Sequence, residues 1–236
     1  MSKQSETTFV SEYDTIRPTP RRTLVLDLDG TLVDTLPDLH ASLNRLMAAH
    51  RLEEFPKSEV ASFIGDGAGV LVRRAMAARS RNAEQADLDA FLADYSAHAA
   101  DESVLFPGVA EGLEKARSDG WRLAVCTNKP EIPARSLLGA LGVAQFFAAI
   151  GGGDSFASRK PDPAHLLATI AAAAGEPGAS VMVGDHRNDV LAATGAAIPA
   201  IFAHWGYGSP DMAAGAAAQA ASFSEILALA DELLSS

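Results

Sequence analysis

The amino-acid sequence predicts an α/β protein, a three-layer sandwich around a parallel sheet, with a small all-helical insert after the first strand. Two observations lead to this prediction. Short apolar runs alternate with longer helical patterns through most of the chain, and one long interval contains helical patterns alone. Short runs that are apolar on both faces are typical of parallel strands, which are joined by crossover helices.

The predicted sheet starts at residues 23–35, "TLVLDLDGTLVDT", and continues through later apolar runs. Because helical patterns separate these runs, we expect right-handed βαβ units and a Rossmann-like core. The alanine-rich stretch 213–221 is compatible with a helix or a compact loop. The later predicted strands are 122–126, 148–150, 180–183 and 199–203, and the predicted core helices are 108–118, 132–141, 164–174, 188–194 and 222–234.

The interval 36–104 shows only helical patterning, in about four segments, and a glycine-rich stretch at 65–69 interrupts it. It is too long for one crossover helix, so we predict a helical domain inserted between the two parts of the core, 23–35 and 105–236. Asp34 is the expected hinge to this domain. Residues 1–22 lack periodicity and are predicted to form a flexible tail.

The composition narrows the classes of function. The chain of 236 residues is 48% hydrophobic and 21% charged, which is ordinary for a globular protein. A formal charge of −11 without a basic patch argues against nucleic acid and anionic membranes as partners. No apolar run is long enough to cross a bilayer and no signal peptide is visible. The single cysteine, Cys126, indicates a reducing cytoplasm and is expected to pack as a small buried side chain. The oligomeric state, monomer or homodimer, stays open.

Polar side chains follow successive strands of the predicted sheet. Ligands of open parallel sheets bind beyond the carboxyl ends of the strands, and residues two apart in extended chain face the same way. Asp27 and Asp29 can therefore point into one crevice. The polar residues that follow the later strands are Thr127, Asn128, Lys160, Asp185 and, one helical turn further, Asp189.

This set of residues predicts phosphoryl-transfer chemistry. Crowded carboxylates repel one another unless a cation lies between them, and hard oxygen ligands suit Mg²⁺, which shares its coordination shell with phosphate. Thr127, Asn128, Lys160 and the amides of a glycine-containing turn can all donate hydrogen bonds to phosphoryl oxygens. One carboxylate can attack phosphorus while a second protonates the leaving oxygen and later activates water. Asp27 and Asp29 supply that pair.

Each feature also has an ordinary structural explanation. The Asp-x-Asp pattern occurs in glycosyltransferase metal sites and in surface turns, Thr127 and Asn128 could cap the following helix, and most lysines like Lys160 are solvated. The occurrence of all these features at successive strand ends favours the phosphoryl-transfer interpretation.

The chain resembles the haloacid dehalogenase-like hydrolase superfamily, and four motifs spanning the core carry the resemblance. By this resemblance Asp27 is the nucleophile and Asp29 the general acid/base, and the presence of Asp29 argues against the dehalogenase branch. The insert corresponds to the family's mobile cap. The motifs are Asp27-Leu-Asp-Gly-Thr-Leu-Val-Asp34, Cys126-Thr-Asn-Lys129, Lys160-Pro-Asp-Pro163 and Gly184-Asp-His-Arg-Asn-Asp189.

The resemblance also implies the ligands of the phosphoryl group and of Mg²⁺. Thr127 and Lys160 would hold the phosphoryl group, with Asn128 and Gly30 beside it. The metal ligands implied are the side chains of Asp27 and Asp185 and the backbone carbonyl of Asp29, while Asp189 would support Lys160 or a metal-bound water.

Three further stretches, "IGDGAGVLVRRAM" (64–76), "CTNKP" (126–130) and "WGYG" (205–208), are similar to the phosphoglycolate phosphatase branch. This likeness implies hydrolysis of 2-phosphoglycolate, a small phosphorylated metabolite. The carboxylate of that substrate needs a partner, and Arg74 with the amides of the 65–69 loop is the expected one. Trp205 and Tyr207 are expected either to line the site or to pack in the core.

Position 186 departs from the family pattern, because His186 replaces a small hydroxyl residue. This histidine could reach the substrate or point to solvent, and exposure to solvent is the expected alternative. Rival functions also stay open. A phosphatase or pyrophosphatase for another small metabolite is the nearest, followed by a sugar phosphomutase of the same architecture. A catalytically inert binding protein is the remote alternative.

Overall fold

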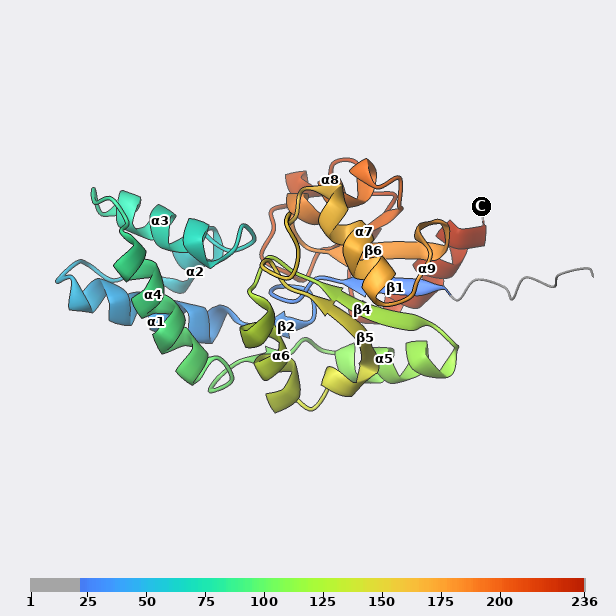
Figure 1. Ribbon diagram of the computed structural model, residues 1–236, viewed down its shortest axis with the longest axis horizontal. Helices are drawn as coiled ribbons and strands as arrows, with labels where there is room; N and C mark the ends of the chain where they lie inside the picture. Colours follow the sequence, from blue (N-terminus) through green and yellow to red (C-terminus); the bar gives the residue numbers. More distant parts are fainter. Residues whose placement is uncertain (1–21, 236) are drawn as a thin grey trace, which may run out of the picture.

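The computed structural model describes residues 22–235 and shows a sheet-containing core beside a helical cap (Figure 1). The predicted flexible tail, 1–22, lies outside the described residues except for Arg22. Within 22–235 no helix is both long enough and apolar enough to span a bilayer.

The core is built on a six-stranded sheet in the order β5-β4-β1-β6-β7-β8, and every neighbouring pair in it is parallel. β1 is central and pairs with β4 on one side and β6 on the other, which confirms the predicted α/β class. The strands are β1 (Thr23–Leu26), β4 (Arg122–Cys126), β5 (Phe147–Gly151), β6 (Ser180–Gly184), β7 (Ala200–Ala203) and β8 (Ala218–Ala220).

The edge strand β8 lies in the alanine-rich stretch for which we expected a helix or a compact loop, so that expectation is wrong. Three residues of β8 pair with Ile201–Ala203 of β7, and Ala220 is fully buried. Alanine has a low preference for strands, and the sequence of β8 therefore carries almost no strand signal. Backbone pairing with β7 decides the conformation here.

Helices cover both faces of the sheet, as the apolar strands require (Figure 1). Along β1, Leu24 and Leu26 contribute to the cluster under one helical layer, whereas Val25 contributes to the cluster under the other. The first layer contains α5 (Val109–Ser118), α6 (Glu131–Ala140) and α9 (Ile226–Ser235), and the second contains α7 (Pro163–Ala172) and α8 (Arg187–Gly195).

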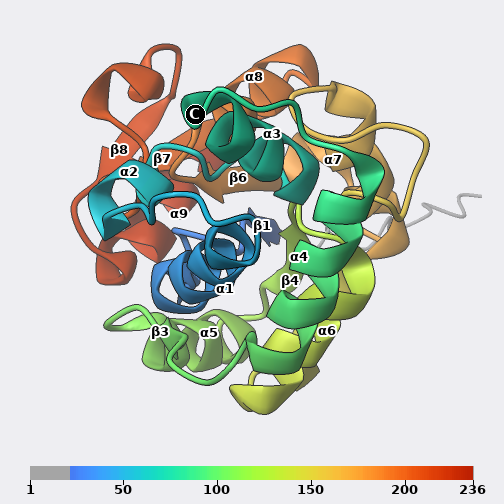
Figure 2. The same ribbon diagram turned by 90° about the vertical axis from the view of Figure 1, so that its left-hand side faces the viewer.

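The insert consists of four helices with a hydrophobic core of their own, to which Leu43, Met47, Met76 and Phe91 contribute fully buried side chains. Figure 2 shows these helices in front of the sheet, over the end where the site lies. The helices are α1 (Leu36–Ala49), α2 (Lys57–Ala61), α3 (Ala68–Ala78) and α4 (Gln85–His98).

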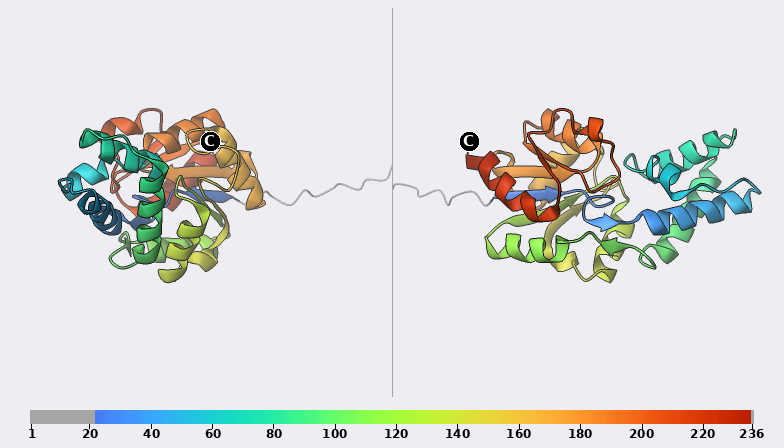
Figure 3. Two further views of the ribbon diagram at one scale, coloured as in Figure 1. Left: turned by 60° about the vertical axis from the view of Figure 1, so that its left-hand side comes forward. Right: turned by 180° about the vertical axis from the view of Figure 1, so that it is seen from behind.

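A short antiparallel ribbon joins the cap to the core. The chain enters the cap through β2 (Val33–Asp34) and returns through β3 (Val104–Leu105), and the two strands pair with each other. The views in Figure 3 show the cap extending from the core beyond this ribbon. Asp34, the expected hinge residue, therefore lies in a two-stranded connection.

Replacement of Leu113 in α5 by alanine should destabilise the core, because its side chain is fully buried between helix and sheet. We expect Leu113→Ala to lower the free energy of unfolding by about 2–5 kcal/mol, measured by urea denaturation. Leu191→Ala in α8 is the matched control, since Leu191 is 47% exposed. This substitution should change the free energy of unfolding by no more than about 0.5 kcal/mol. Equal losses in the two variants would contradict this packing.

Candidate active site

Asp27 follows β1 directly and is anchored through one carboxylate oxygen. Its Oδ1 accepts the backbone N–H of Leu28 at 2.7 Å and lies 2.8 Å from the Lys160 ammonium. Burial raises the pKa of Asp27 to about 6, although the charge of Lys160 acts in the opposite direction. Both of these contacts are made by Oδ1, so this one oxygen determines the orientation of the carboxylate.

Lys160 lies between two buried carboxylates. Its Nζ is 2.6 Å from Oδ1 of Asp189 in addition to its contact with Asp27, and all three side chains are almost fully buried. Burial acts to lower the pKa of Lys160, but Asp189 and Asp27 outweigh it and raise this pKa above its ordinary value. The lysine is therefore charged and neutralises part of the acidic cluster.

Asp185 is held by neutral donors. Its Oδ2 accepts the N–H groups of Tyr207 at 2.7 Å and Gly208 at 3.3 Å, and the Thr31 hydroxyl donates to its Oδ1 at 3.1 Å. Burial raises the pKa of Asp185 to about 7, and the charges of Asp27 and Asp189 add to the increase. In the described part of the chain Asp185 has no ion pair with a basic side chain.

The acidic cluster fits a metal ion. One carboxylate oxygen each from Asp27, Asp185 and Asp189 lies within 4.8 Å of the other two. Oxygen donors crowded in this way in a buried site suit a hard divalent cation, and Lys160 alone does not neutralise three carboxylates. The family resemblance implied the side chains of Asp27 and Asp185 and the backbone carbonyl of Asp29 as metal ligands, whereas it gave Asp189 only a supporting role.

Three glycines enclose Asp185. A Cβ atom on Gly30 would lie 2.3 Å from Oδ2 of Asp185, and Gly30 also has a φ of +87°. Cβ atoms on Gly206 and Gly208 would come within 2.3 Å and 1.8 Å of Asp185 atoms. Gly30 therefore allows the chain to turn away after Asp29 and allows the carboxylate to approach the backbone.

The side chain of Asp29 is not part of the acidic cluster and pairs with Lys129. Its Oδ1 and Oδ2 lie 2.9 Å and 3.3 Å from the Lys129 ammonium, which also donates to the Tyr95 hydroxyl at 2.7 Å. Burial acts to lower the pKa of Lys129, but Asp29 and Tyr95 outweigh it and raise this pKa above its ordinary value. The sequence pattern gave Lys129 no role, although this lysine stands directly after the polar residues that follow β4.

Thr127 and Asn128 follow β4 and face the same region. The Thr127 hydroxyl accepts the N–H of Lys129 at 3.2 Å. The Asn128 amide donates to the carbonyl of Lys160 and to that of Gly65 in the cap, both at 3.0 Å. Asn128 therefore connects the core to the cap loop that precedes α3.

Arg74 lies on α3 and makes contacts within the cap. Its guanidinium pairs with Asp66 and donates to the Phe63 carbonyl, and its side chain is 40% exposed. Asp66 in turn accepts a hydrogen bond from Asn188 of the core at 2.7 Å. The structure thus places Arg74 behind a cap-to-core contact and outside the lining of the cavity described below.

The expectation that His186 points to solvent is wrong. Its Nδ1 accepts the N–H of Asn188 at 3.3 Å, so the imidazole caps the first turn of α8. The ring also packs against Gly65, where an added Cβ would lie 2.5 Å from it. Burial lowers the pKa of His186, and we conclude that this residue joins the core to the cap.

Trp205 packs against the core, whereas Tyr207 also lines a second cavity beside Asp29 and Asp185. The Trp205 indole donates to the Thr31 carbonyl at 3.0 Å, and its ring meets Phe223 edge-on. The Tyr207 hydroxyl donates to Asp34 at 2.7 Å and accepts the N–H groups of residues 35 and 36. Cys126 is fully buried as predicted, and burial raises its pKa to about 12.

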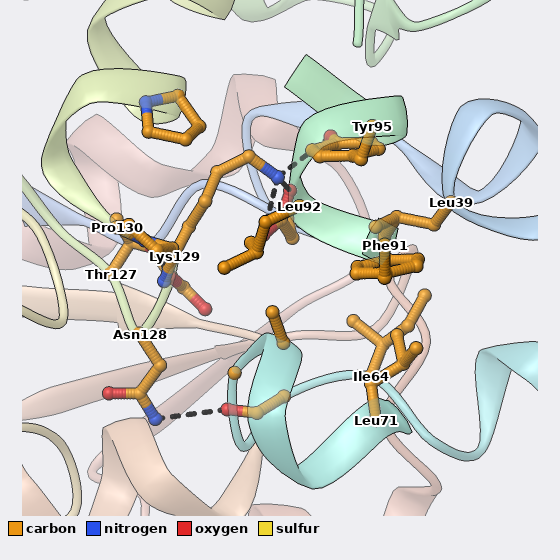
Figure 4. Close-up of a pocket in the computed structure, with 16 residues that line it drawn as sticks. Leu39, Ile64, Leu71, Phe91, Leu92, Tyr95, Thr127, Asn128, Lys129 and Pro130 are labelled. Atoms are coloured by element: carbon orange, nitrogen blue, oxygen red, sulfur yellow. Dashed lines mark hydrogen bonds and ion pairs between the residues drawn. The ribbon is translucent and has the colours of Figure 1, made fainter. Parts of the chain in front are cut away.

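A cavity lies between the cap and the strand ends (Figure 4). Its core side carries the polar groups, and its cap side is largely apolar, so a ligand held there would be shielded from water. The core contributes Asp27, Asp29, Thr127, Asn128, Lys129, Pro130 and Pro133, and the cap contributes Leu39, Ile64, Gly65, Gly67, Ala68, Leu71, Phe91, Leu92 and Tyr95.

The comparisons with known proteins agree with this fold. The sequence model of the haloacid dehalogenase-like hydrolases matches residues 24–203. A phosphoglycolate phosphatase of Agrobacterium fabrum is 46% identical over 187 residues, which cover 78% of this chain and 80% of that protein. A phosphoglycolate phosphatase of Rhodospirillum rubrum is 40% identical over 194 residues, covering 79% and 80%.

Solved structures agree. A predicted phosphoglycolate phosphatase from Haemophilus somnus superposes with a TM-score of 0.81 at 30% identity, covering 89% of this chain and 97% of that one. CbbY from Rhodobacter sphaeroides, solved in complex with phosphate, has a TM-score of 0.77 at 27% identity, covering 89% and 99%. The chain belongs to the haloacid dehalogenase-like hydrolase family. Within that family it is a phosphatase.

His165 supplies a test of the site's electrostatics. It is fully buried, its Nδ1 accepts the N–H of Lys160 at 3.2 Å, and its Nε2 lies 3.1 Å from the Gly152 carbonyl. These partners require the neutral ring with the proton on Nε2. Burial, assisted by the charge of Lys160, lowers the pKa of His165 from 6.5 to about 4.

Between pH 6.5 and about 4, the unfolded chain should therefore bind a proton at His165, whereas the folded protein should keep this ring neutral. Stability due to the neutral ring is complete above pH 6.5 and is lost as the pH falls from 6.5 to about 4. We expect the unfolding free energy of the wild type, measured in EDTA, to fall more steeply across this window than that of His165→Asn. His98→Asn in the cap is the control and should keep the wild-type slope. Equal slopes for all three proteins would contradict the depressed pKa.

Proposed function

We propose that this phosphatase hydrolyses 2-phosphoglycolate to glycolate and phosphate through an aspartyl-phosphate on Asp27, with Mg²⁺ as the metal. The observation that carries the proposal is the pair of neighbouring carboxylates with opposite environments. Asp27 belongs to the acidic cluster with Lys160, whereas Asp29 lies outside it and pairs with Lys129. Such a division gives a nucleophile and a separate acid/base group at one strand end.

In the first step a carboxylate oxygen of Asp27 attacks phosphorus, and the bond from phosphorus to the ester oxygen breaks. Lys160 lies 2.8 Å from Oδ1 of Asp27 and offsets the charge of this group as an anionic phosphoryl group approaches. Thr127 and Asn128, beside Asp27 in the cavity lining, are the proposed neighbours of the phosphoryl oxygens. Gly30, which the family resemblance placed beside the phosphoryl group, donates its own N–H to the Val33 carbonyl at 3.0 Å.

Asp29 is the proposed acid and base. It gives a proton to the departing ester oxygen, so that glycolate leaves as an alcohol. It then takes a proton from water, whose oxygen attacks phosphorus and releases Asp27. The apolar cap side of the cavity supports this sequence, because it limits access of water while the first bond breaks.

A divalent cation would be held by Asp27 and Asp185, with the backbone carbonyl of Asp29 and with Asp189 close by. When bound, it offsets the charge of the carboxylates and of the phosphoryl group. The lack of an ion pair for Asp185 among residues 22–235 is the feature that supports this assignment.

The substrate is inferred from the named relatives. Those that are 40–46% identical over about four fifths of their length are phosphoglycolate phosphatases. A kcat/KM survey over phosphorylated metabolites, including sugar phosphates, nucleotides and pyrophosphate, tests this inference. 2-Phosphoglycolate should give the highest value, and a higher value for another compound would reassign the substrate.

Asp27→Asn should remove the nucleophile and lower kcat by more than about a thousandfold, while circular dichroism and thermal melting show an intact fold. Rapid quenching with radiolabelled substrate should trap phosphoprotein in the wild type and none in the variant. Asp119→Asn, at the end of α5, is the matched control and should keep wild-type turnover. Full activity of Asp27→Asn would exclude this residue as the nucleophile.

Removal of metal by EDTA should abolish turnover, and Mg²⁺ should restore it. Mg²⁺ should also raise the melting temperature of the wild type, since a ligand bound only to the folded state stabilises it. Asp185→Asn should need far more Mg²⁺ for half-maximal activity and should lose the thermal shift. Asp101→Asn, in the loop after α4, should behave as the wild type. Turnover indifferent to EDTA would disprove the metal assignment.

A further inference from the structure

The cavity contains a cation that the proposed phosphoryl-transfer steps do not use. Among its lining residues Lys129 is the only basic side chain, and it is 6% exposed. Figure 4 shows the ammonium reaching from the core side toward Tyr95 of the cap. The Asp29 carboxylate offsets the cost of burying this ammonium, and the pair places a positive charge in the lining of the cavity.

We propose that Lys129, together with the Tyr95 hydroxyl, binds the carboxylate of the substrate's leaving group and thereby determines specificity. The proposal rests on the proposed function, because it takes Asp29 as the group that faces the leaving oxygen. It defines the substrate class as short phosphate esters with a carboxylate one carbon from the ester oxygen.

The position of Lys129 matches the structure of such a substrate. Its Nζ lies 2.9 Å from Oδ1 of Asp29. The ester oxygen must come within hydrogen-bond distance of Asp29 to receive a proton. Since one methylene group separates that oxygen from the carboxylate in 2-phosphoglycolate, the carboxylate then falls beside the ammonium.

The hydrogen-bond donors required are also available. The Lys129 ammonium has three N–H donors and three contacts, two to the Asp29 carboxylate and one to the Tyr95 hydroxyl. A substrate carboxylate would therefore replace the longest of them, the 3.3 Å contact to Oδ2 of Asp29. Because the Tyr95 oxygen accepts from Lys129, its own hydrogen is free to donate, and the described residues give that hydrogen no acceptor. The two residues together offer one charged and one neutral donor.

The remaining lining makes this pair selective. Leu39, Leu71, Phe91 and Leu92 surround the far side of the cavity and offer no alternative polar contact. In such surroundings a charge-assisted hydrogen bond is strong, and a leaving group without a carboxylate would leave the donors unmatched. The site therefore discriminates by charge as well as by size.

Arg74 is the competing candidate for carboxylate recognition. Its guanidinium is engaged with Asp66 and the Phe63 carbonyl, and it is absent from the cavity lining. For Arg74 to bind the substrate, the Asp66 contact with Asn188 would have to rearrange. Lys129 needs no such rearrangement.

The test compares 2-phosphoglycolate with ethyl phosphate, which has the same chain length and no carboxylate. We expect Lys129→Met to lower kcat/KM for 2-phosphoglycolate about 10- to 100-fold more than for ethyl phosphate. Tyr95→Phe should show a smaller loss with the same selectivity. Lys115→Met, a lysine on the exposed face of α5, is the matched control and should leave both values unchanged.

Equal losses for both substrates would mean that Lys129 only positions Asp29, and would overturn the proposal. A selective loss in Arg74→Met with none in Lys129→Met would also overturn it.

Product inhibition provides a second measurement that does not depend on the turnover rate. Lys129→Met should weaken inhibition by glycolate and leave inhibition by inorganic phosphate near its wild-type value. Unchanged glycolate inhibition would count against the assignment.

The proposed substrate and the role of Lys129 can fail separately. If the wild type shows no preference for 2-phosphoglycolate over ethyl phosphate, the proposed substrate is wrong. In that case the same variants are compared on 2-phospholactate and 2-phosphoglycerate, which keep one carbon between the ester oxygen and the carboxylate, against esters without a carboxylate. A selective loss on the carboxylates would support Lys129, and a uniform effect would exclude it.

Discussion

The ion pairs of Lys160 with Asp27 and Asp189 are the interaction on which the site depends. Three carboxylates converge in a buried space, and their mutual repulsion would oppose folding if no positive charge accompanied them. The ammonium lies within 2.8 Å of Asp27 and 2.6 Å of Asp189, so it joins the end of β1 to the start of α8. Asp185 remains without an ion pair among the described residues, and it is this unbalanced charge that makes the cluster suited to a cation.

A second set of contacts joins the cap to this core. Asn128 and Asn188 both bind the Gly65–Asp66 segment, and His186 packs against Gly65. On the other side of the cavity, Lys129 bonds to Tyr95. The cap therefore contacts the core through residues adjacent to those proposed for catalysis.

The sequence was sufficient to predict the site residues that directly follow the strands of the sheet. Asp27, Asp29, Thr127 and Asp185 could be located because a parallel sheet brings its carboxyl ends to one edge. Lys129 could not, because four rotatable bonds separate its ammonium from the backbone, and the partner Tyr95 comes from a distant helix.

Other features depend on tertiary contacts that sequence patterns do not contain. Helical spacing predicted that Arg74 lies on a cap helix, but it could not show that the guanidinium forms an ion pair with Asp66. The solvent orientation expected of His186 failed because the cap loop covers that position. The strand β8 was missed since alanine gives no period-two pattern, and its pairing with β7 is decided by backbone hydrogen bonds.

The glycine enclosure of Asp185 bears on the energetics of ligand binding. Because Gly30, Gly206 and Gly208 contact the carboxylate through backbone atoms, and two of its three donors are amides, the pocket has few rotamers to reorganise. The oxygen atoms that would face a bound cation are already in place. Binding would therefore cost the protein little side-chain entropy. Affinity at this position is therefore determined mainly by desolvation and charge.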